Sequence, residues 1–364
     1  MARTSERAQR GGHSGVSIED VAAAAGVSTA TVSRAVRGLP RVSPATREKI
    51  LRVAAELGYV ASSSASGLAT GRTKTIGVLA PFVSRWFFSK AIEGADRELH
   101  ARQYNLSLFN LGGHGSNRER LFSRTMVYKQ IDALLVLCMA LTHEELNHLQ
   151  KIDIPLVVVG GHVEECAYIG IDDYAAASTA VRHLISLGHK DIALLHGDDE
   201  TDLNFDVPRV RIKAFQDVMT ASGLDLRPEW DEVGDFTVRS GQQAFIKLWG
   251  NSGPKPTAIF CASDEMAMGV IFEANRRGVR VPEDLSVIGI DDHDFSVTLG
   301  LTTVGQRPDV QAELATKMLL DELDGRPGSV RSMVAPHQLI VRSTTAPPPA
   351  HGAPGQREPR PVTA

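Results

Sequence analysis

From residue 75 onward, short apolar runs alternate with amphipathic stretches of helical length, and this alternation strongly constrains the fold. The apolar runs lack a strict apolar–polar alternation, which is typical of strands buried on both faces of a parallel sheet. The runs lie at 76–80, 106–109, 133–137, 156–159, 192–195, 258–261 and 286–290, and the amphipathic stretches at 88–102, 175–187, 209–221, 240–249, 265–277 and 310–323. Because a single sheet of about a dozen strands is unusual, we expect a two-lobed α/β domain.

The segment 17–37 predicts two short helices joined by a turn. Ser17 is a good N-cap, and Asp20, three residues later, completes an acidic capping box. Gly26 permits the turn, and Ser28 caps the second helix. Apolar residues recur on one face of each helix, at Ile18, Val21, Ala22, Ala25, Val32, Ala35 and Val36. The pattern predicts a helix-turn-helix, a motif whose second helix enters the major groove of DNA. An ordinary helical hairpin on a protein surface is the alternative.

A third amphipathic helix follows, with Ser43 as N-cap, Pro44 at its first position and Gly58 at its end. Charge separates this all-α module from the rest of the chain. Residues 1–74 carry 11 Lys and Arg against 5 Asp and Glu, whereas the remaining 290 residues carry 28 against 38. A basic module on an acidic body is typical of a protein whose small part alone binds nucleic acid. Chance clustering of arginines near the N-terminus is the alternative.

Composition divides the chain into five parts. Residues 1–15 are polar and rich in Gly and Arg, and residues 346–364 are rich in Pro, so both are predicted to be disordered tails. Residues 16–61 form the helix-turn-helix domain, 62–72 a linker of mostly small residues, and 73–345 the two-lobed domain. Leu68 is the one large apolar side chain in the linker.

The three cysteines, Cys138, Cys166 and Cys261, are far apart and form no Cys-x-x-Cys motif, which favours reduced thiols. The N-terminus lacks the apolar stretch of a secretory signal, and no apolar run has transmembrane length. We therefore expect a cytoplasmic protein that does not enter a membrane.

Catalytic and metal-binding motifs are not supported by the spacing of the residues that they need. His143 and His148 are five residues apart, whereas a zinc-protease helix places its two histidines four apart on one face. The segment 67–73 has one spacer too few for a phosphate-binding loop and an Arg where that loop needs Lys. No Gly-x-Ser-x-Gly elbow occurs. The sequence thus predicts no enzyme, no metal site and no cofactor.

Taken together, these residues resemble the lactose-repressor (LacI/GalR) family of bacterial transcription regulators, from about residue 17 to residue 342. The head carries Asp20-Val-Ala-Ala-Ala-Ala-Gly-Val-Ser, Thr31-Val-Ser-Arg34, Val42-Ser-x-x-Thr-Arg47 and Leu57-Gly-Tyr59. The body carries Leu187-Gly-His189-x-x-Ile192, Arg211-x-x-Ala-Phe215, Ser263-Asp-x-Met-Ala-x-Gly269, Val281-Pro-x-Asp-Leu-Ser-Val-Ile-Gly-Ile-Asp291-Asp292 and Leu301-Thr-Thr303. The resemblance implies an all-α helix-turn-helix headpiece, a hinge helix, and an α/β two-lobed effector-binding and dimerisation domain like the periplasmic binding proteins.

The resemblance also implies a DNA interface. By position, Thr29, Ala30 and Arg34 read bases, and Leu68 inserts into the minor groove. The remaining implied DNA-binding residues are Ser17, Ser28, Thr31, Ser33 and Arg37, of which Ser28, Thr31 and Ser33 lie where the family contacts phosphates. The chain departs from the family pattern in its hinge, where Ala61-Ser62 replaces Pro-Asn and Ala65-Ser66 replaces Ala-Arg. We expect a hinge that orders only on operator binding, and Arg37 with Arg41 to replace the lost backbone contacts.

The implied effector site lies at the carboxyl ends of the strands, between the lobes. The matching residues are Phe87, Phe88, Arg211, Phe236, Ser263 and Asp291. Aromatic rings stack on the flat apolar faces of sugars, while Arg and Asp hydrogen-bond hydroxyls. Structural alternatives are that Phe87 or Phe88 belongs to the core, that Asp291-Asp292 caps a helix, and that Arg211 pairs with Asp291.

The predicted function is a cytoplasmic repressor that binds a near-palindromic double-stranded operator as a homodimer and is controlled by a small carbohydrate, a mono- or disaccharide. A dimer is expected rather than a tetramer, because the C-terminal residues are Pro-rich instead of forming heptads. The alternatives are a sugar-binding transport protein and a regulator that responds to a non-sugar metabolite such as a nucleobase. An enzyme on an α/β scaffold lacks any nucleophile–base or metal set.

Overall fold

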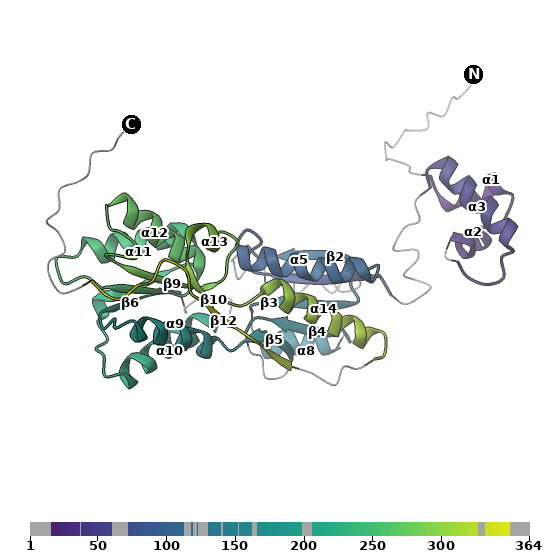
Figure 1. Cartoon of the computed structure of the whole chain (residues 1–364). Coiled ribbons are helices and arrows are strands. Elements are labelled where there is room, and N and C mark those ends of the chain that lie inside the picture. Colours follow the sequence, from purple (N-terminus) through teal and green to yellow (C-terminus); the bar gives the residue numbers. More distant parts are fainter. Residues whose placement is uncertain are drawn as a thin grey trace, which may run out of the picture. The chain divides into compact units, whose positions relative to one another are not determined.

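The computed structural model describes residues 16–36, 38–59, 72–112, 118, 122, 130–139, 141–151, 153–161, 166–198, 206–326 and 332–349. Contacts divide the chain into two compact units, with the division between Lys74 and Thr75. Each unit is described by itself below (Figure 1). No helix in these described parts is both long and apolar enough to cross a membrane.

The first unit contains three helices, α1 (Ile18–Ala25), α2 (Thr29–Val36) and α3 (Pro44–Leu57). The predicted capping box is present, since the amide of Asp20 donates to Ser17 Oγ over 3.2 Å and the amide of Ser17 donates to Asp20 Oδ2 over 2.9 Å. Gly26 ends α1 in the left-handed conformation, at φ 67°. Local signals in the sequence therefore set the helix ends as expected.

The core of this unit is built mainly from small and β-branched side chains, namely Val21, Ala22, Ala25, Val32, Ala35, Ile50 and Ala54. These residues come from all three helices, so that each helix buries the face that its apolar spacing predicted. The Arg47 guanidinium of α3 donates to the carbonyl oxygen of Leu39 over 2.5 Å and ties the α2–α3 connection to α3. The side chain of Leu57, by contrast, is 38% exposed.

The second unit contains two six-stranded sheets, and the first sheet has the order β11-β5-β4-β3-β1-β2 with all pairs parallel. Its strands are β1 (Thr75–Ala80), β2 (Asn105–Asn110), β3 (Ala133–Leu137), β4 (Leu156–Val159), β5 (Ala167–Ile171) and β11 (Ser332–Ala335). Helices α5 (Trp86–Ala101) and α14 (Pro308–Leu323) pack together on one face, and α8 (His143–Lys151) packs on the other. This sheet and its helices form the first lobe.

The second sheet has the order β12-β10-β9-β8-β6-β7. Its strands are β6 (Ile192–Gly197), β7 (Asp231–Gly234), β8 (Ala258–Cys261), β9 (Ser286–Asp291), β10 (Thr302–Gly305) and β12 (Gln338–Ile340). Helices α9 (Asp173–Ser186) and α10 (Val207–Ala221) cover one face, while α11 (Val238–Gly250) and α12 (Asp264–Arg276) cover the other. Two short helices complete this second lobe, η1 (Pro228–Trp230) and α13 (Ser296–Leu299).

The predicted two-lobed α/β architecture is thus confirmed, and the chain passes between the lobes three times. The crossings follow β5, precede α14, and separate β11 from β12. The last crossing adds an antiparallel strand, β12 against β10, to an otherwise parallel sheet. The ordered body also continues past residue 345, where composition predicts the tail to begin. The carbonyl oxygen of Ala346 accepts hydrogen bonds from His189 Nε2 over 2.8 Å and from Ser286 Oγ over 3.0 Å.

Candidate functional site

The outward face of α2 carries the residues that the sequence assigns to DNA bases. Thr29, Ala30 and Arg34 are exposed, whereas Val32 and Ala35 of the same helix are buried in the core. This separation follows from helical spacing, because residues three and four apart share a face. The predicted contacts Arg37 and Leu68 lie outside the described residues.

Three of the hydroxyl groups assigned to the DNA surface also stabilise the helix ends. Ser17 Oγ donates to Asp20 Oδ2 over 2.8 Å. Ser28 Oγ accepts from the amide of Thr31 over 3.2 Å and lies 2.9 Å from Thr31 Oγ1. Ser28 and Thr31 lie at the start of α2, where amides without intrahelical partners favour an anion such as phosphate, and Ser33 lies one turn farther along the helix. The hydroxyl proton of Ser17, in contrast, is already directed to a carboxylate.

A cavity of about 190 Å³ lies between the two lobes, at the carboxyl ends of their strands. Its lining includes all six residues assigned to the effector, which are Phe87, Phe88, Arg211, Phe236, Ser263 and Asp291. The cavity is also lined by five residues to which the sequence pattern gave no role, namely Arg85, Asp173, Asp235, Glu265 and Gln306. The fold therefore brings residues more than 200 positions apart in the sequence, such as Phe87 and Asp291, into one cleft.

Aromatic rings from both lobes form part of the cleft wall. Phe87 meets Phe88 edge to face, with ring centroids 5.5 Å apart, and Phe82 lies 6.1 Å from Phe88. Phe88 also belongs to the core of the first lobe, so it serves packing as well as the cleft. The ring of Phe236 lies over Gly197, where a Cβ atom would overlap it. Phe236 adopts a left-handed backbone conformation at φ 59°, which is uncommon for an aromatic residue.

Arg211 forms an ion pair with Asp173, the first residue of α9. Its Nη2 lies 2.6 Å and its Nε 2.9 Å from Asp173 Oδ1, and its Nη1 donates to the carbonyl oxygen of Ala262. The side chain of Arg211 is buried, with 5% of its surface exposed, and that of Asp173 is nearly so, with 11% exposed. The pairing of Arg211 with Asp291 that the sequence left open is therefore wrong, because Asp173 takes that place.

Asp291, the last residue of β9, is held from the other side. Gln306 Nε2 donates to its Oδ1 over 2.5 Å, and the amide of Asp264 lies 3.4 Å from its Oδ2. Burial raises the pKa of Asp291 well above its usual value, because desolvation disfavours the charged carboxylate. Ser263 is the N-cap of α12 and accepts from the amide of Met266 over 3.3 Å. The Ser263 oxygen acts as acceptor in this bond, so its hydroxyl hydrogen can still be donated to another group.

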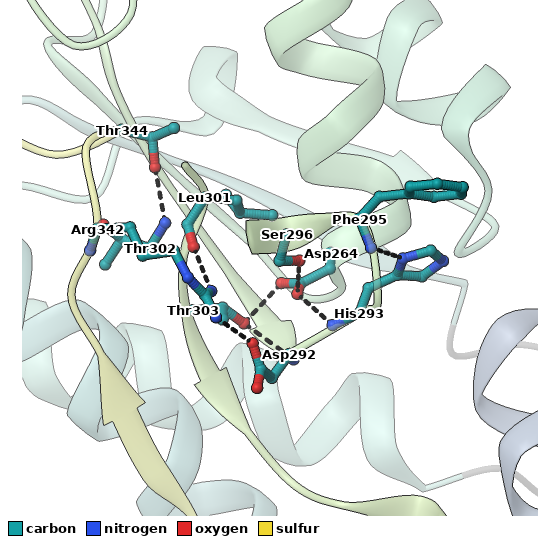
Figure 2. Close-up of polar contacts among 10 residues, drawn as sticks. All are labelled: Asp264, Asp292, His293, Phe295, Ser296, Leu301, Thr302, Thr303, Arg342 and Thr344. Atoms are coloured by element: carbon teal, nitrogen blue, oxygen red, sulfur yellow. Dashed lines mark hydrogen bonds and ion pairs between the residues drawn. The ribbon is translucent and has the colours of Figure 1, made fainter. Parts of the chain in front are cut away.

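Asp264, whose amide contacts Asp291, is the centre of a buried polar cluster that sequence reasoning missed. Figure 2 shows this cluster. Asp264 Oδ2 accepts from the amide of His293 over 2.9 Å and from Ser296 Oγ over 2.7 Å. Its Oδ1 accepts from Thr303 Oγ1 over 2.7 Å. Burial raises the pKa of Asp264 to about 6, although these hydrogen bonds favour its charged form. The sequence signals of this cluster are the Ser263-Asp264 pair at a helix start and the motifs that contain Asp292 and Thr303.

Arg342, which follows β12, also belongs to this cluster (Figure 2). Its Nη2 donates to Asp292 Oδ1 over 2.6 Å, and its Nη1 donates to the carbonyl oxygen of Leu301 over 2.8 Å. Asp291 and Asp292 both have positive φ values, 142° and 58°. Such conformations persist where the surroundings over-determine them. The cluster thus fixes the backbone that presents Asp291 to the cleft.

Within the described residues, no group of three or more His, Cys, Asp or Glu side chains is placed to hold a metal ion. The lining of the cleft includes aromatic rings, charged side chains and hydrogen-bonding groups. Such a lining suits reversible binding of a small polar molecule with apolar faces.

Comparison with known proteins agrees with this anatomy. Residues 17–62 match the family described as "Bacterial regulatory proteins, lacI family", and residues 181–345 match the "Periplasmic binding protein-like domain". The chain is 35% identical over 334 residues to Catabolite control protein A of Priestia megaterium, covering 91% of this chain and 99% of that protein.

Two solved structures extend the likeness to the whole fold. The lac repressor dimer bound to operator and the anti-inducer ONPF matches with a TM-score of 0.77 at 26% identity, over 92% of this chain and 100% of that chain. The complex of the transcriptional regulator CelR with cellobiose matches with a TM-score of 0.65 at 28% identity, over 90% and 99% of the two chains. The chain therefore belongs to the lacI family of bacterial regulatory proteins and is a DNA-binding transcriptional repressor.

Proposed function

We propose that this repressor releases its operator in response to a small carbohydrate, a mono- or disaccharide, that binds in the cleft between the lobes. Regulators of this family bind operators, dimerise and respond to small-molecule effectors. The observation that carries the proposal is the composition of the cleft. Phe87 and Phe236 offer rings to the apolar faces of a sugar, and Arg211, Ser263 and Asp291 offer hydrogen-bonding groups to its hydroxyls.

The relation to CelR supports the carbohydrate class, because that regulator was solved with cellobiose. A planar nucleobase is the second candidate, since the same rings suit base stacking. Sugar binding differs from base binding in the number of hydroxyl groups that the polar side chains can satisfy. The relatives are transcription regulators rather than enzymes or transport proteins.

On DNA, we propose that a cytoplasmic homodimer presents two copies of α2 to a near-palindromic operator. Thr29, Ala30 and Arg34 contact bases, and Ser28, Thr31 and Ser33 contact phosphates through the start of α2. The proposed domains are the head at 16–61, a hinge at 62–72 that includes Leu68, and the body from 73. Effector binding favours one arrangement of the lobes, and its differential affinity for the two states sets the size of the response.

A thermal-shift screen of mono- and disaccharides tests the carbohydrate proposal, with nucleosides and nucleobases in the same plate. We expect at least one sugar to raise the melting temperature and then to release operator DNA in a fluorescence-anisotropy titration. Stabilisation and release by a nucleobase, with no response to any sugar, would contradict the carbohydrate class.

A further inference from the structure

The charged residues that line the cleft are mostly acidic. They comprise five carboxylates, Asp173, Asp198, Asp235, Glu265 and Asp291, against two guanidinium groups, Arg85 and Arg211. Without Asp291, whose pKa burial raises well above its usual value, the formal charges of the lining sum to −2. Several apolar rings share the same walls, and low-dielectric walls strengthen the field that charges produce in a cleft.

Arg211 is not available to balance an incoming negative charge. Its guanidinium already contacts the Asp173 carboxylate at 2.6 Å and 2.9 Å, and its remaining terminal nitrogen donates to the carbonyl of Ala262. A ligand anion placed against Arg211 would compete with a buried carboxylate for the same charge. Arg211 can still donate hydrogen bonds to a neutral hydroxyl group through its other N–H bonds.

Arg85 belongs to the first lobe and faces two carboxylates of the second lobe. Its guanidinium lies over the ring of Phe82, 3.7 Å from the centroid. Burial lowers the pKa of Arg85, while Asp235 and Glu265 act in the opposite direction. Arg85 is the cation that an anionic ligand would need, and the negative charges of Asp235 and Glu265 act on it through space.

Glu265 is partly buried at the same place, and burial raises its pKa while the backbone amide of Trp86 favours its charged form. A hydroxyl group that enters between Arg85 and Glu265 can accept from the guanidinium and donate to the carboxylate. A phosphate group has no proton to donate in its dianionic form, and it would meet both Glu265 and Asp235.

We propose that the cleft selects an uncharged polyhydroxylated ligand and excludes its anionic derivatives, such as sugar phosphates and nucleotides, because Asp235 and Glu265 repel the added charge. This inference rests on the proposed function only in placing the effector in the cleft. The charge rule holds equally for a neutral sugar and for a neutral nucleoside.

Matched pairs of neutral and anionic compounds test this rule on the full-length protein. The pairs are glucose and glucose 6-phosphate, ribose and ribose 5-phosphate, and adenosine and its 5′-monophosphate, measured by isothermal titration calorimetry. We expect the phosphate of the bound pair to bind at least tenfold more weakly than its neutral member. Equal or tighter binding of the phosphate would overturn the inference. Binding of adenosine over its phosphate, with no sugar bound, would instead overturn the carbohydrate proposal and leave the charge rule standing.

A charge-neutral variant separates repulsion from a lack of space. The double variant Asp235→Asn/Glu265→Gln keeps the shape of both side chains and removes two negative charges. We expect the neutral-to-phosphate affinity ratio to fall at least fivefold in this variant. The control is Glu229→Gln, which neutralises an exposed carboxylate of the same lobe outside the cleft and should keep the wild-type ratio. An unchanged ratio in the double variant would show that size, not charge, excludes the phosphate, and would overturn the role of these two residues.

Discussion

The ammonium group of Lys90, on α5 of the first lobe, lies 3.2 Å from the carboxylate of Asp294, in the loop after β9 of the second lobe. Beside this ion pair, the ring of Trp86 lies 5.0 Å from that of His293. The loop begins directly after Asp291 of the cleft, and α5 contains Phe87 and Phe88. The contact therefore links the ligand-lining residues of the two lobes at one edge of the cleft.

Lys90→Ala should weaken effector binding about fivefold or less, because an exposed ion pair is worth about 1 kcal/mol at most. The pair holds the lobes in the arrangement in which both line one cavity. A titration of effector by calorimetry measures the change. Lys213→Ala is the matched control, since Lys213 pairs with Asp217 within α10 and spans no lobes. Equal affinities in the two variants would show that the Lys90–Asp294 pair does not support the liganded arrangement.

Arg211→Ala should abolish the response to effector while leaving operator binding intact. The change also strands the buried carboxylate of Asp173, so the free energy of unfolding should fall by about 3–5 kcal/mol. The double variant Arg211→Met/Asp173→Asn should recover much of that stability without recovering the response. Urea unfolding and operator-release titrations distinguish the two effects. Wild-type induction by Arg211→Ala would remove Arg211 from the effector site.

Gly197→Ala should weaken effector binding at least tenfold and also lower stability. A Cβ at residue 197 overlaps the ring of Phe236, which packs against the core of the second lobe, so the ring must leave both that packing and its place in the cleft wall. Gly250→Ala is the control, because a Cβ there meets no atom within 4 Å. Unaltered affinity in Gly197→Ala would mean that the position of Phe236 is unimportant for the ligand.

The seven apolar runs of the sequence all coincide with strands, and six of these are buried along most of their length, because strands covered on both faces need continuous apolar residues. The exception is the edge strand β2, whose residues are exposed or half-buried. Five strands were missed, and four of them lack that apolar signal. β7 reads Asp-Glu-Val-Gly and lies at an edge, β11 and β12 are short edge strands, and β10 begins with two threonines. The fifth, β5, reads Ala-Tyr-Ile-Gly-Ile, so its apolar run was overlooked. Thr302 and Thr303 are fully buried because hydrogen bonds satisfy their hydroxyls. Only tertiary contacts, which the local pattern does not contain, make that possible.

The candidate cleft was predictable in part. Residues that follow recognisable strands, such as Ser263 and Asp291, could be placed at the carboxyl ends of a sheet from order alone. The ion pair of Arg211 with Asp173 could not be predicted, since the two residues are 38 positions apart and meet only when α9 and α10 pack together. The opposition of Arg85 and Glu265 depends on how two lobes face each other, which no local spacing encodes.

The contribution of Asp264 to stability should fall as the pH rises from about 4 to about 6. Burial raises the pKa of Asp264 to about 6 in the folded protein, against 3.8 for an ordinary aspartate. The folded state therefore holds the proton more tightly, and stability is highest below the unfolded pKa and is lost as the carboxyl ionises. A shift of this size corresponds to about 3 kcal/mol, at about 1.36 kcal/mol per pH unit.

Urea unfolding of wild type and Asp264→Asn between pH 4 and 7 measures this contribution. The free energy of unfolding of the variant should rise relative to wild type by up to about 3 kcal/mol across that range. Because the charge of Asp264 also raises the pKa of Asp291, the difference reports Asp264 together with its effect on Asp291. A difference that does not change with pH would place the titration elsewhere.

The most direct measurement of sequence-specific recognition by α2 is selection of bound DNA from a random pool by the full-length protein, without ligand and at low ionic strength. Arg34 is exposed on that helix, and bidentate contact of an arginine with guanine is worth about 1–3 kcal/mol. We predict enrichment of a near-palindromic sequence. We also predict that Arg34→Lys, which keeps the charge, lowers affinity for that sequence about 5- to 150-fold while its affinity for unrelated DNA hardly changes. Failure of the wild-type protein to enrich any palindrome, or equal binding of selected and unrelated DNA, would contradict recognition through α2.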